Sequence, residues 1–353
     1  MIKIYKKAKD VPYNETDVFL HFTGNIFGIG CSTFNDEAIK KIMTLKGRNE
    51  KKGFIVLFAS LEQAKKYQLP QLRSKKIVSF LGQYLPGNLT TLLEIDNRQF
   101  TNVCMFNKIA FRIPRTRVLR EFINRIGAPV LSTSINVAGQ PFCSDLNTLH
   151  KDYSDWFDYG LYDPSEPAES PIPSTIIEFD ETWKKLKFLR EGSIPFAEIE
   201  ESWNKPLIQF VCVGNICRSP LAEYYVRGRL IKEEMPFETA SSGLLEGRRM
   251  ISEHSKYILD SNQIPVKNRA SVTIDAATVS RSMLLICMSK DIKDDLIKKY
   301  PEASEKAFTF AEFTDNKADI DDPYGLEAEA YNKAWNLIRQ YTEPLLKKLK
   351  EMY

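Results

Sequence analysis

Residues 211–220 of this chain read Val211-Cys212-Val213-Gly214-Asn215-Ile216-Cys217-Arg218-Ser219-Pro220. A short apolar run, 207–211, leads into this segment, and a helix-like run, 221–231, follows it. A tight loop between a strand and a helix start turns backbone N–H groups inward, where they bind anions. The same helix end favours a thiolate on Cys212, and the planar guanidinium of Arg218 binds two phosphate oxygens at once. The segment therefore predicts a site that binds a phosphate group and attacks its phosphorus.

The remainder of the second half predicts an α/β domain around this loop. We expect strands at 208–211, 238–240, 283–288 and 306–310, separated by helical stretches, and a last helix at 328–350. Strands that alternate with helices form a mainly parallel sheet that is covered on both faces.

The first half also alternates between strands and helices. We expect strands at 18–22, 53–59, 90–95, 109–113, 129–132 and 174–179, and helices at 36–45, 61–68, 75–82 and 116–126. A chain of 353 residues is long enough for two domains. We predict an α/β protein with one domain at 1–195, a linker at 196–206 and a second domain at 207–353.

Charge is unevenly distributed along the chain, although the net charge is only +3. Residues 1–150 hold 22 Lys and Arg against 11 Asp and Glu, whereas 151–205 hold 6 against 13. A basic stretch suits a nucleotide or RNA partner, and a solvated basic surface without a partner explains it equally well.

No stretch resembles a signal peptide or a membrane-spanning helix, so we expect no membrane association. The six cysteines are scattered rather than arranged as a secreted disulfide framework. A cytoplasmic location follows as the expectation. The three histidines share no ligand spacing, and we predict no metal site.

The loop at 211–220 resembles that of the low-molecular-weight protein-tyrosine-phosphatase family. Asp322-Pro323-Tyr324-Gly325 stands where that family has an Asp-Pro-aromatic motif, and the resemblance covers roughly 207–350. It implies a flavodoxin-like parallel sheet and a phosphatase that needs no cofactor.

The resemblance also implies a role for each residue of the loop. Cys212 is the expected nucleophile, Arg218 binds the phosphoryl oxygens, and Asp322 is the expected general acid and base. Ser219 supports the sulfur and Asn215 braces the loop, while Tyr324 forms a wall for the phosphosubstrate. The phosphate-binding residues are Val213, Gly214, Asn215, Ile216, Cys217 and Ser219.

Two classes of phosphosubstrate remain open at this point: a phosphorylated protein or a small phosphate ester. Bacterial protein-arginine phosphatases are a close branch of the family, and they carry a threonine at the position of Ile216. The isoleucine favours phosphotyrosine or another aryl phosphate, with protein-arginine phosphatase as the alternative.

Residues 1–200 resemble the YrdC-type threonylcarbamoyl-AMP synthase family, which implies a twisted mixed α/β sheet. The motifs that carry the resemblance occur in the family's order: Thr23-Gly24-Asn25-Ile26-Phe27-Gly28-Ile29-Gly30, Lys46-Gly47-Arg48, Leu85-Pro86-Gly87-Asn88-Leu89-Thr90, Arg112-Ile113-Pro114, Ser134-Ile135-Asn136, Pro173-Ser174-Thr175-Ile176 and Arg190 with Gly192.

The family condenses threonine, bicarbonate and ATP, with Mg²⁺ accompanying the nucleotide, into threonylcarbamoyl-AMP for tRNA threonylcarbamoyladenosine synthesis. Cationic side chains neutralise the triphosphate, and hydroxyl and amide groups hold phosphate, ribose or carboxylate oxygens. The expected ATP- and threonine-binding residues are Thr23, Asn25, Lys46, Arg48, Thr90, Arg112, Ser134, Asn136, Ser174 and Arg190. Expected partners include tRNA or tRNA-modification proteins.

The stretch at 22–25 departs from the family pattern, because Phe22, Gly24 and Asn25 replace a proline, an acid and a hydroxyl residue. Two readings therefore stay open for the first domain. One is a threonylcarbamoyl-AMP synthase, and the other is a nucleotide- or RNA-binding regulatory module for the phosphatase.

Overall fold

The computed structural model describes residues 3–47, 54–96, 100–136, 145–168, 171–266 and 269–352. It divides into two compact units, Met1–Ile199 and Glu200–Tyr353. The stretch predicted as a linker, 196–206, is largely helical, because α6 covers Phe196–Asn204. Its residues Ile199 and Trp203 are buried at a helical spacing of four, a pattern that the surrounding glutamates obscure in the sequence.

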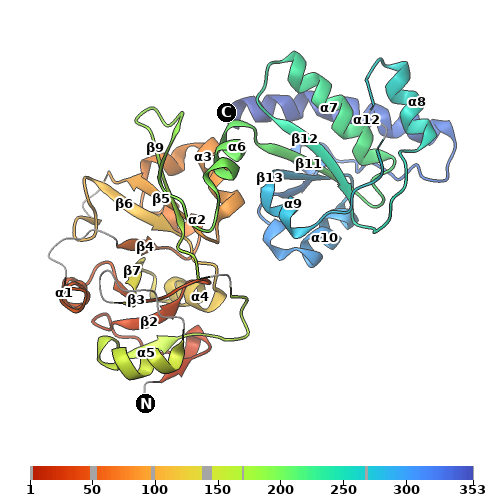
Figure 1. Ribbon diagram of the computed structural model, residues 1–353. Coiled ribbons are helices and arrows are strands. Elements are labelled where there is room, and N and C mark those ends of the chain that lie inside the picture. Colours follow the sequence, from red (N-terminus) through yellow and green to blue (C-terminus); the bar gives the residue numbers. More distant parts are fainter. Residues whose placement is uncertain are drawn as a thin grey trace. The chain divides into compact units, whose positions relative to one another are not determined.

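The first unit is built on one mixed sheet of ten strands in the order β1-β8-β2-β3-β7-β4-β6-β5-β9-β10 (Figure 1). The strands are β1 (Ile4–Tyr5), β2 (Phe19–Phe22), β3 (Phe27–Ser32), β4 (Ile55–Leu57), β5 (Leu89–Glu94), β6 (Lys108–Arg112), β7 (Val130–Ser134), β8 (Tyr159–Leu161), β9 (Thr175–Phe179) and β10 (Leu186–Arg190). The helices are α1 (Asp36–Leu45), α2 (Leu61–Lys65), α3 (Lys75–Tyr84), α4 (Arg117–Ile126) and α5 (Leu146–Tyr153). Both parallel and antiparallel pairs occur across the sheet, which confirms the mixed architecture.

Local sequence signals fix the helix ends in this unit. The side chain of Asn35 accepts a hydrogen bond from the backbone N–H of Ala38 and so begins α1. Gly127, in the left-handed region at φ 69°, ends α4. The helices predicted at 36–45, 61–68, 75–82 and 116–126 are confirmed.

Strand β3 is absent from the sequence-based prediction, because two glycines interrupt its apolar pattern. The structure shows why they are there: the ring of His21 lies against both. A Cβ atom on Gly28 would come 2.9 Å from Cε1 of His21 and 2.7 Å from the carbonyl oxygen of Thr133. Tertiary packing therefore overrides the low strand propensity of glycine here.

The second unit holds a parallel sheet of four strands in the order β12-β11-β13-β14. The strands are β11 (Leu207–Cys212), β12 (Glu238–Gly243), β13 (Ser282–Cys287) and β14 (Ala307–Thr309). The helices are α7 (Arg218–Lys232), α8 (Glu253–Ser261), α9 (Ala276–Arg281), α10 (Lys290–Lys299), α11 (Phe310–Phe313) and α12 (Ala328–Met352). Figure 1 shows α7 and α12 on one face of the sheet and α9 and α10 on the other, which confirms the doubly covered parallel sheet.

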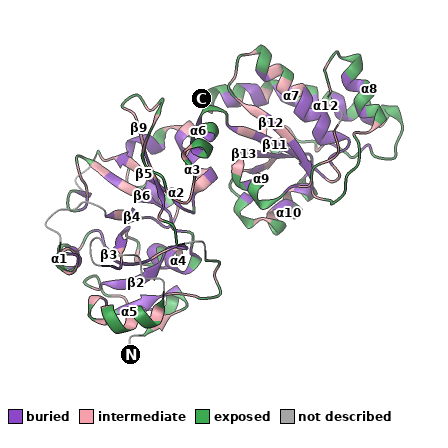
Figure 2. Ribbon diagram, viewed as in Figure 1, coloured by how far each residue is buried: buried purple, intermediate pink, exposed green. Residues whose placement is uncertain are grey.

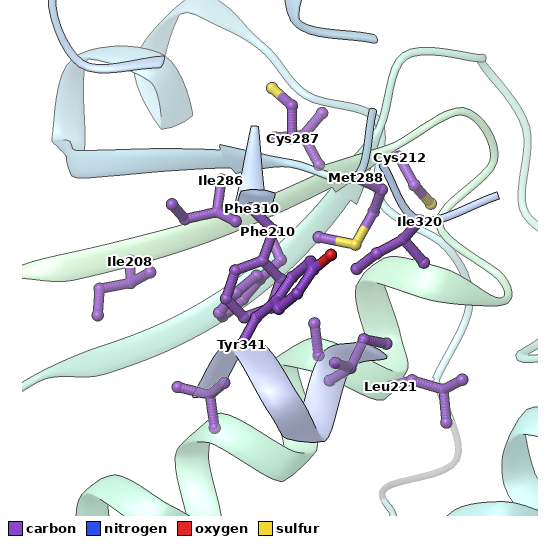
Figure 3. Packing of buried hydrophobic residues seen from close by; sticks show 14 of the residues in the cluster. Ile208, Phe210, Cys212, Leu221, Ile286, Cys287, Met288, Phe310, Ile320 and Tyr341 are labelled. Atoms are coloured by element: carbon purple, nitrogen blue, oxygen red, sulfur yellow. The ribbon is translucent and has the colours of Figure 1, made fainter. Parts of the chain in front are cut away.

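The strands of each sheet are mostly buried, whereas the helices bury one side only (Figure 2). In the second unit the rings of Phe210, Phe310 and Tyr341 form the centre of the core, with centroids 5.8 and 5.6 Å apart (Figure 3). Met288 extends this core towards residues 213–217, which we call the phosphate loop after the sequence-based prediction. Its backbone hydrogen-bonds to both Val211 and Ile320. The end of β11 is thus anchored in a dense apolar core.

Within the part of the chain that the structure describes, we find no helix that is both long enough and apolar enough to cross a membrane.

Candidate active sites

The first candidate site lies where β11 ends and α7 begins. Cys212 is the last residue of β11 and Arg218 is the first residue of α7, so residues 213–217 form the connecting loop. Asn215 takes a left-handed conformation with φ 54°, which bends the loop back over the sulfur. A Cβ atom on Gly243 would lie 2.7 Å from the carbonyl oxygen of Val213, so the end of β12 leaves just enough room for the loop. The loop therefore has the strand–turn–helix geometry of an anion site.

Hydrogen-bond donors surround the sulfur of Cys212, which is only 3% exposed. The hydroxyl of Ser219 lies 3.0 Å from Sγ, and the backbone N–H of Asn215 donates to Sγ at 3.2 Å. The amide of Asn215 donates to the oxygen of Ser219 at 3.0 Å. The sulfur therefore lies within hydrogen-bonding distance of one backbone N–H and one hydroxyl group.

Arg218 and Asp322 form an ion pair of 2.5 Å beside this loop. Arg218 is 4% exposed and also donates to the carbonyl oxygen of Ile320 at 3.0 Å, whereas the side chain of Asp322 is 43% exposed. Within the described ranges no group accepts a hydrogen bond from Nε of Arg218. A buried guanidinium with one unused donor is equipped to take an oxyanion.

Tyr324 and Cys217 occupy different surroundings near the loop. Tyr324 is 61% exposed, two residues beyond Asp322, so it is accessible to a substrate. Cys217 is buried, its sulfur lies 3.5 Å from the hydroxyl of Tyr331, and burial raises the pKa of its thiol. The ring of Tyr331 stacks on that of His254, with ring centroids 4.8 Å apart.

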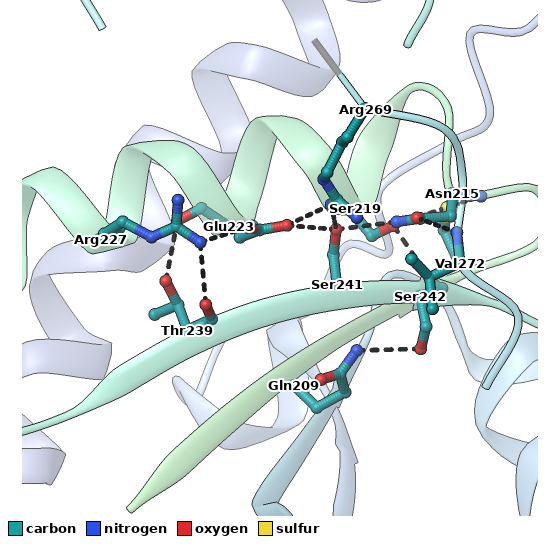
Figure 4. A network of polar contacts seen from close by, with 11 residues as sticks. Gln209, Asn215, Ser219, Glu223, Arg227, Thr239, Ser241, Ser242, Arg269 and Val272 are labelled. Atoms are coloured by element: carbon teal, nitrogen blue, oxygen red, sulfur yellow. Dashed lines mark hydrogen bonds and ion pairs between the residues drawn. The ribbon is translucent and has the colours of Figure 1, made fainter. Parts of the chain in front are cut away.

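A polar network supports the loop from behind, and the sequence analysis did not find it (Figure 4). The amide of Asn215 donates to the hydroxyl of Ser241 at 2.8 Å, and Ser241 donates to the carboxylate of Glu223 at 2.6 Å. Glu223 is 4% exposed and is paired with Arg227 and Arg269. The network joins α7, β12 and the loop; no spacing motif connects its members along the chain.

In the first unit, Arg112 is the centre of a buried polar group. It donates to the carbonyl oxygen of Gly87 at 2.9 Å, to Oδ1 of Asn25 at 3.1 Å and to Oδ1 of Asn88. Thr23 donates to the same oxygen of Asn25 at 2.9 Å. Asn88 belongs to this group, although the sequence analysis did not single it out.

Lys46 holds a second group together at the end of β7. Its ammonium donates to the carbonyl oxygen of Ser134 at 2.8 Å, to Oδ1 of Asn136 at 3.2 Å and to the carbonyl oxygen of Asn136. The hydroxyl of Ser134 donates to Oδ1 of Asn136 at 2.6 Å.

Ser174 links two further predicted residues. Its hydroxyl lies 2.8 Å from that of Thr90, and its carbonyl oxygen accepts a hydrogen bond of 2.8 Å from Arg190. The structure thus gathers nine of the predicted residues into three hydrogen-bonded groups. Arg48 lies outside the described residues.

The hydrogen bonds described for these three groups involve no carboxylate. Over the ranges that the structure describes, no cluster of three or more His, Cys, Asp or Glu side chains is arranged to hold a metal ion. The polar groups that meet there are hydroxyls, amides, carbonyl oxygens and the cations of Lys and Arg. This combination binds anions and polar ligands rather than a bare divalent cation.

Comparisons with known proteins match each half of the chain separately. Residues 18–192 match the Sua5/YciO/YrdC family model, described as telomere recombination, and residues 207–353 match the low molecular weight phosphotyrosine protein phosphatase model. A threonylcarbamoyl-AMP synthase of Vibrio campbellii is 30% identical over 140 residues, which are 39% of this chain and 76% of that protein.

Relatives of the second half carry two different names. A protein-arginine-phosphatase of Geobacillus stearothermophilus is 31% identical over 146 residues, which are 40% of this chain and 95% of that protein. The solved low molecular weight protein tyrosine phosphatase of T. tengcongensis is 27% identical, with a TM-score of 0.39, and the match covers 40% of this chain and 99% of that one. The chain therefore belongs to two families at once, with a Sua5/YciO/YrdC domain of the threonylcarbamoyl-AMP synthases followed by a low-molecular-weight phosphatase domain.

Proposed function

We propose that this protein is a bifunctional enzyme. The first activity, in residues 1–195, forms threonylcarbamoyl-AMP from threonine, bicarbonate and ATP for tRNA threonylcarbamoyladenosine synthesis. The second activity, in residues 207–353, hydrolyses phosphate monoesters through a phosphocysteine. We expect a cytoplasmic location, because a nucleophilic Cys212 needs a reducing environment.

The phosphatase reaction proceeds in two balanced steps. The thiolate of Cys212 attacks phosphorus, forming an S–P bond while the P–O bond to the leaving group breaks and Asp322 donates its proton to that oxygen. The carboxylate of Asp322 then takes a proton from water as the water oxygen attacks phosphorus. The S–P bond breaks, the thiolate is restored and inorganic phosphate leaves.

One observation carries this proposal: Cys212 and Arg218 are both buried at the two ends of one tight loop, the N–H of Asn215 donates to the sulfur, and one guanidinium donor of Arg218 is left over. A phosphoryl group here would meet the loop amides and Arg218 together, which stabilises the charge that develops in the transition state.

The test is hydrolysis of p-nitrophenyl phosphate by the whole chain. Cys212→Ser keeps the shape of the loop but removes the thiolate, so turnover should disappear. Cys104→Ser, which changes a free cysteine in the first domain, is the matched control and should leave the rate unchanged. Turnover that survives Cys212→Ser contradicts the phosphocysteine mechanism.

Phosphoarginine is a second candidate substrate, because the Geobacillus relative is named a protein-arginine-phosphatase. Ile216, an apolar β-branched residue of the loop, favours an aryl phosphate instead. Rates on a phosphotyrosine peptide and on a phosphoarginine peptide of the same sequence decide between the two. We expect the phosphotyrosine peptide to be preferred, and Ile216→Thr to reduce that preference.

For the first domain, the arrangement of cations and neutral oxygens supports nucleotide and threonine binding. Lys46 and Arg112 are both buried and both are held in place by carbonyl or amide oxygens. Cations fixed in this way neutralise a triphosphate without reorganisation as pyrophosphate leaves. Hydroxyl groups of Thr23, Thr90 and Ser174 supply directional bonds to ribose or carboxylate oxygens.

Mg²⁺ enters this reaction as part of the nucleotide substrate. The described donors around Lys46 and Arg112 do not form a protein-held Mg²⁺ site, since Mg²⁺ prefers carboxylates together with substrate phosphates and water. No step of the proposed reaction is assigned to a metal held by the chain.

The test of the first activity is release of pyrophosphate and formation of threonylcarbamoyl-AMP from threonine, bicarbonate and labelled ATP. Lys46→Ala should abolish the product, whereas Lys40→Ala, which changes an exposed lysine of the preceding helix α1, should not. ATP or RNA binding without any product would show instead that this domain is a regulatory module.

A further inference from the structure

A loop of the second domain, residues 244–252, borders the phosphate loop on one side. Its first residues are tied to the start of that loop, because the backbone N–H groups of Leu244 and Leu245 donate to the carbonyl oxygens of Cys212 and Val213 at 3.1 and 3.0 Å. We call residues 244–252 the border loop.

The far end of the border loop returns to the same place. Ser252 donates from its backbone N–H to the carbonyl oxygen of Ile216 at 2.8 Å. In between, the backbone N–H of Ser271 donates to the carbonyl oxygen of Arg249 at 2.7 Å. The hydroxyl of Ser271 accepts from the N–H of Arg249 and donates to the carbonyl oxygen of Gly247, both at 3.0 Å. Both ends of the border loop are therefore bonded to the segment at 212–216, and its middle is bonded to Ser271.

The border loop carries two unneutralised cations. Arg248 and Arg249 are exposed, and among the residues described no carboxylate forms an ion pair with either of them. The only acid on the loop is Glu246, which leaves an excess of positive charge. Because Arg218 already serves the phosphate, these cations are available to another part of the substrate.

Apolar side chains flank the arginines. Leu245 is 53% exposed, Met250 is 50% exposed, and Val272, whose N–H is bonded to Asn215, is 48% exposed. Exposed apolar side chains on and next to the border loop fit contact with a macromolecule better than contact with a small ester. Together with the cations, they fit an extended protein segment.

We propose that Arg248 and Arg249 make the phosphatase selective for phosphorylated protein segments with acidic residues next to the phosphorylated residue. The proposal rests on the phosphatase function proposed above and names its substrate class. The two arginines act by charge on the flanking residues, and the chemistry stays with Cys212, Arg218 and Asp322.

The expected size of the effect follows from exposed ion pairs. Each such pair contributes about 0.2–1 kcal/mol, so two of them favour an acidic flank by roughly two- to thirtyfold. The contribution is screened by salt, because the charges are in contact with water.

The experiment compares kcat/KM for two phosphotyrosine peptides that differ only in flanking Asp or flanking Lys. The whole chain should prefer the Asp peptide, and the ratio should fall towards one in the Arg248→Ala, Arg249→Ala double variant. The ratio should also shrink between about 0.05 and 0.5 M salt. Arg339→Ala, which removes an exposed arginine of α12, is the matched control and should keep the ratio.

Because the readout is a ratio, a general loss of activity in the double variant cancels. Equal rates on both peptides, or a preference that survives the double variant, would overturn the proposal. Hydrolysis of p-nitrophenyl phosphate by the unmodified chain reports the phosphatase function separately, so failure of the selectivity and failure of the function are distinguishable.

Discussion

Two acidic residues stand next to each other at the phosphatase site, and the structure distinguishes them. Asp322 is paired with the buried guanidinium of Arg218, whereas Asp321 is 80% exposed and is paired with Lys333. Of the two acids, only Asp322 is therefore paired with Arg218.

Asp322→Asn should lower kcat on p-nitrophenyl phosphate by about 10²–10⁴, because the leaving group loses its proton donor. Asp321→Asn is the matched control and should change kcat less than about twofold, since an exposed pair contributes little. Steady-state kinetics on both variants check this. A larger loss in Asp321→Asn would reverse the assignment of the acid.

The same ion pair predicts competition for Arg218. Asp322 accepts a hydrogen bond from a guanidinium donor of Arg218 that the phosphoryl group of the proposed reaction would also use. Asp322→Ala should therefore lower the inhibition constant of inorganic phosphate, by roughly two- to fivefold for a half-exposed partner. Weaker phosphate inhibition in this variant would show that the pair does not oppose anion binding.

Residue types and their order were enough to predict the tight turn between a strand and a helix at 211–220, because Cys212, Arg218 and their neighbours are contiguous. They were not enough to predict Ser241, which contacts Asn215 because β12 pairs with β11, or Arg269, which contacts Glu223 and Ser241. Ordinary serines and arginines carry no signal of that proximity.

At the scale of elements, the network behind the loop connects β12 to α7. Ser241 holds Asn215 on one side and Glu223 on the other, so strand and helix fix the loop jointly. Thr239 lies on the same strand, and its hydroxyl donates to the backbone carbonyl oxygen of Glu223 at 3.3 Å.

Substitutions that remove the hydroxyl of Ser241 or of Thr239 distinguish support of the phosphate loop from a general contribution to stability. Ser241→Ala should destabilise the second domain by about 1–2 kcal/mol and also lower kcat, because Asn215 loses an acceptor. Thr239→Val should cost a similar amount of stability with no change in kcat. Denaturant unfolding and kinetics on the two variants check this, and equal kcat in both would remove the positioning role.

Element prediction succeeded where local pattern and fold agree. The helix at 36–45 has its cap and its apolar face, and the observed α1 has the same limits. Strand β3 and helix α6 were missed for opposite reasons. The glycines of β3 are explained by the ring of His21, and the glutamates of α6 hid its narrow buried face.

At the scale of the whole molecule, one buried group makes the first unit sensitive to acid. Burial, reinforced by the charge of Arg112, lowers the pKa of His21 to about 3. Its unfolded-state pKa is about 6.5, so the unfolded chain binds more protons between these values. This contribution to stability is complete above about pH 6.5 and is lost as the pH falls.

The first unit should therefore lose about 2 kcal/mol through His21 alone between pH 7 and pH 5. In His21→Gln, which cannot take up the proton, this part of the pH dependence should be absent. Calorimetry on the whole chain at both values of pH measures it. His254→Gln, at an exposed position of the second unit, should keep the dependence of the parent, and an unchanged slope in His21→Gln would contradict the assignment.

Strand β11 is paired along its length with β12 on one side and β13 on the other. Amides in such a strand exchange with deuterium only when the surrounding sheet opens, so those of residues 207–212 should be among the slowest of the second domain to take up the label. Cys212 thus ends a strand whose hydrogen bonds are expected to open more slowly than most others in the second domain. Opening of the edge strand β14 or of the surrounding helices then leaves the position of the Cys212 sulfur unchanged, because the two neighbouring strands keep β11 in place.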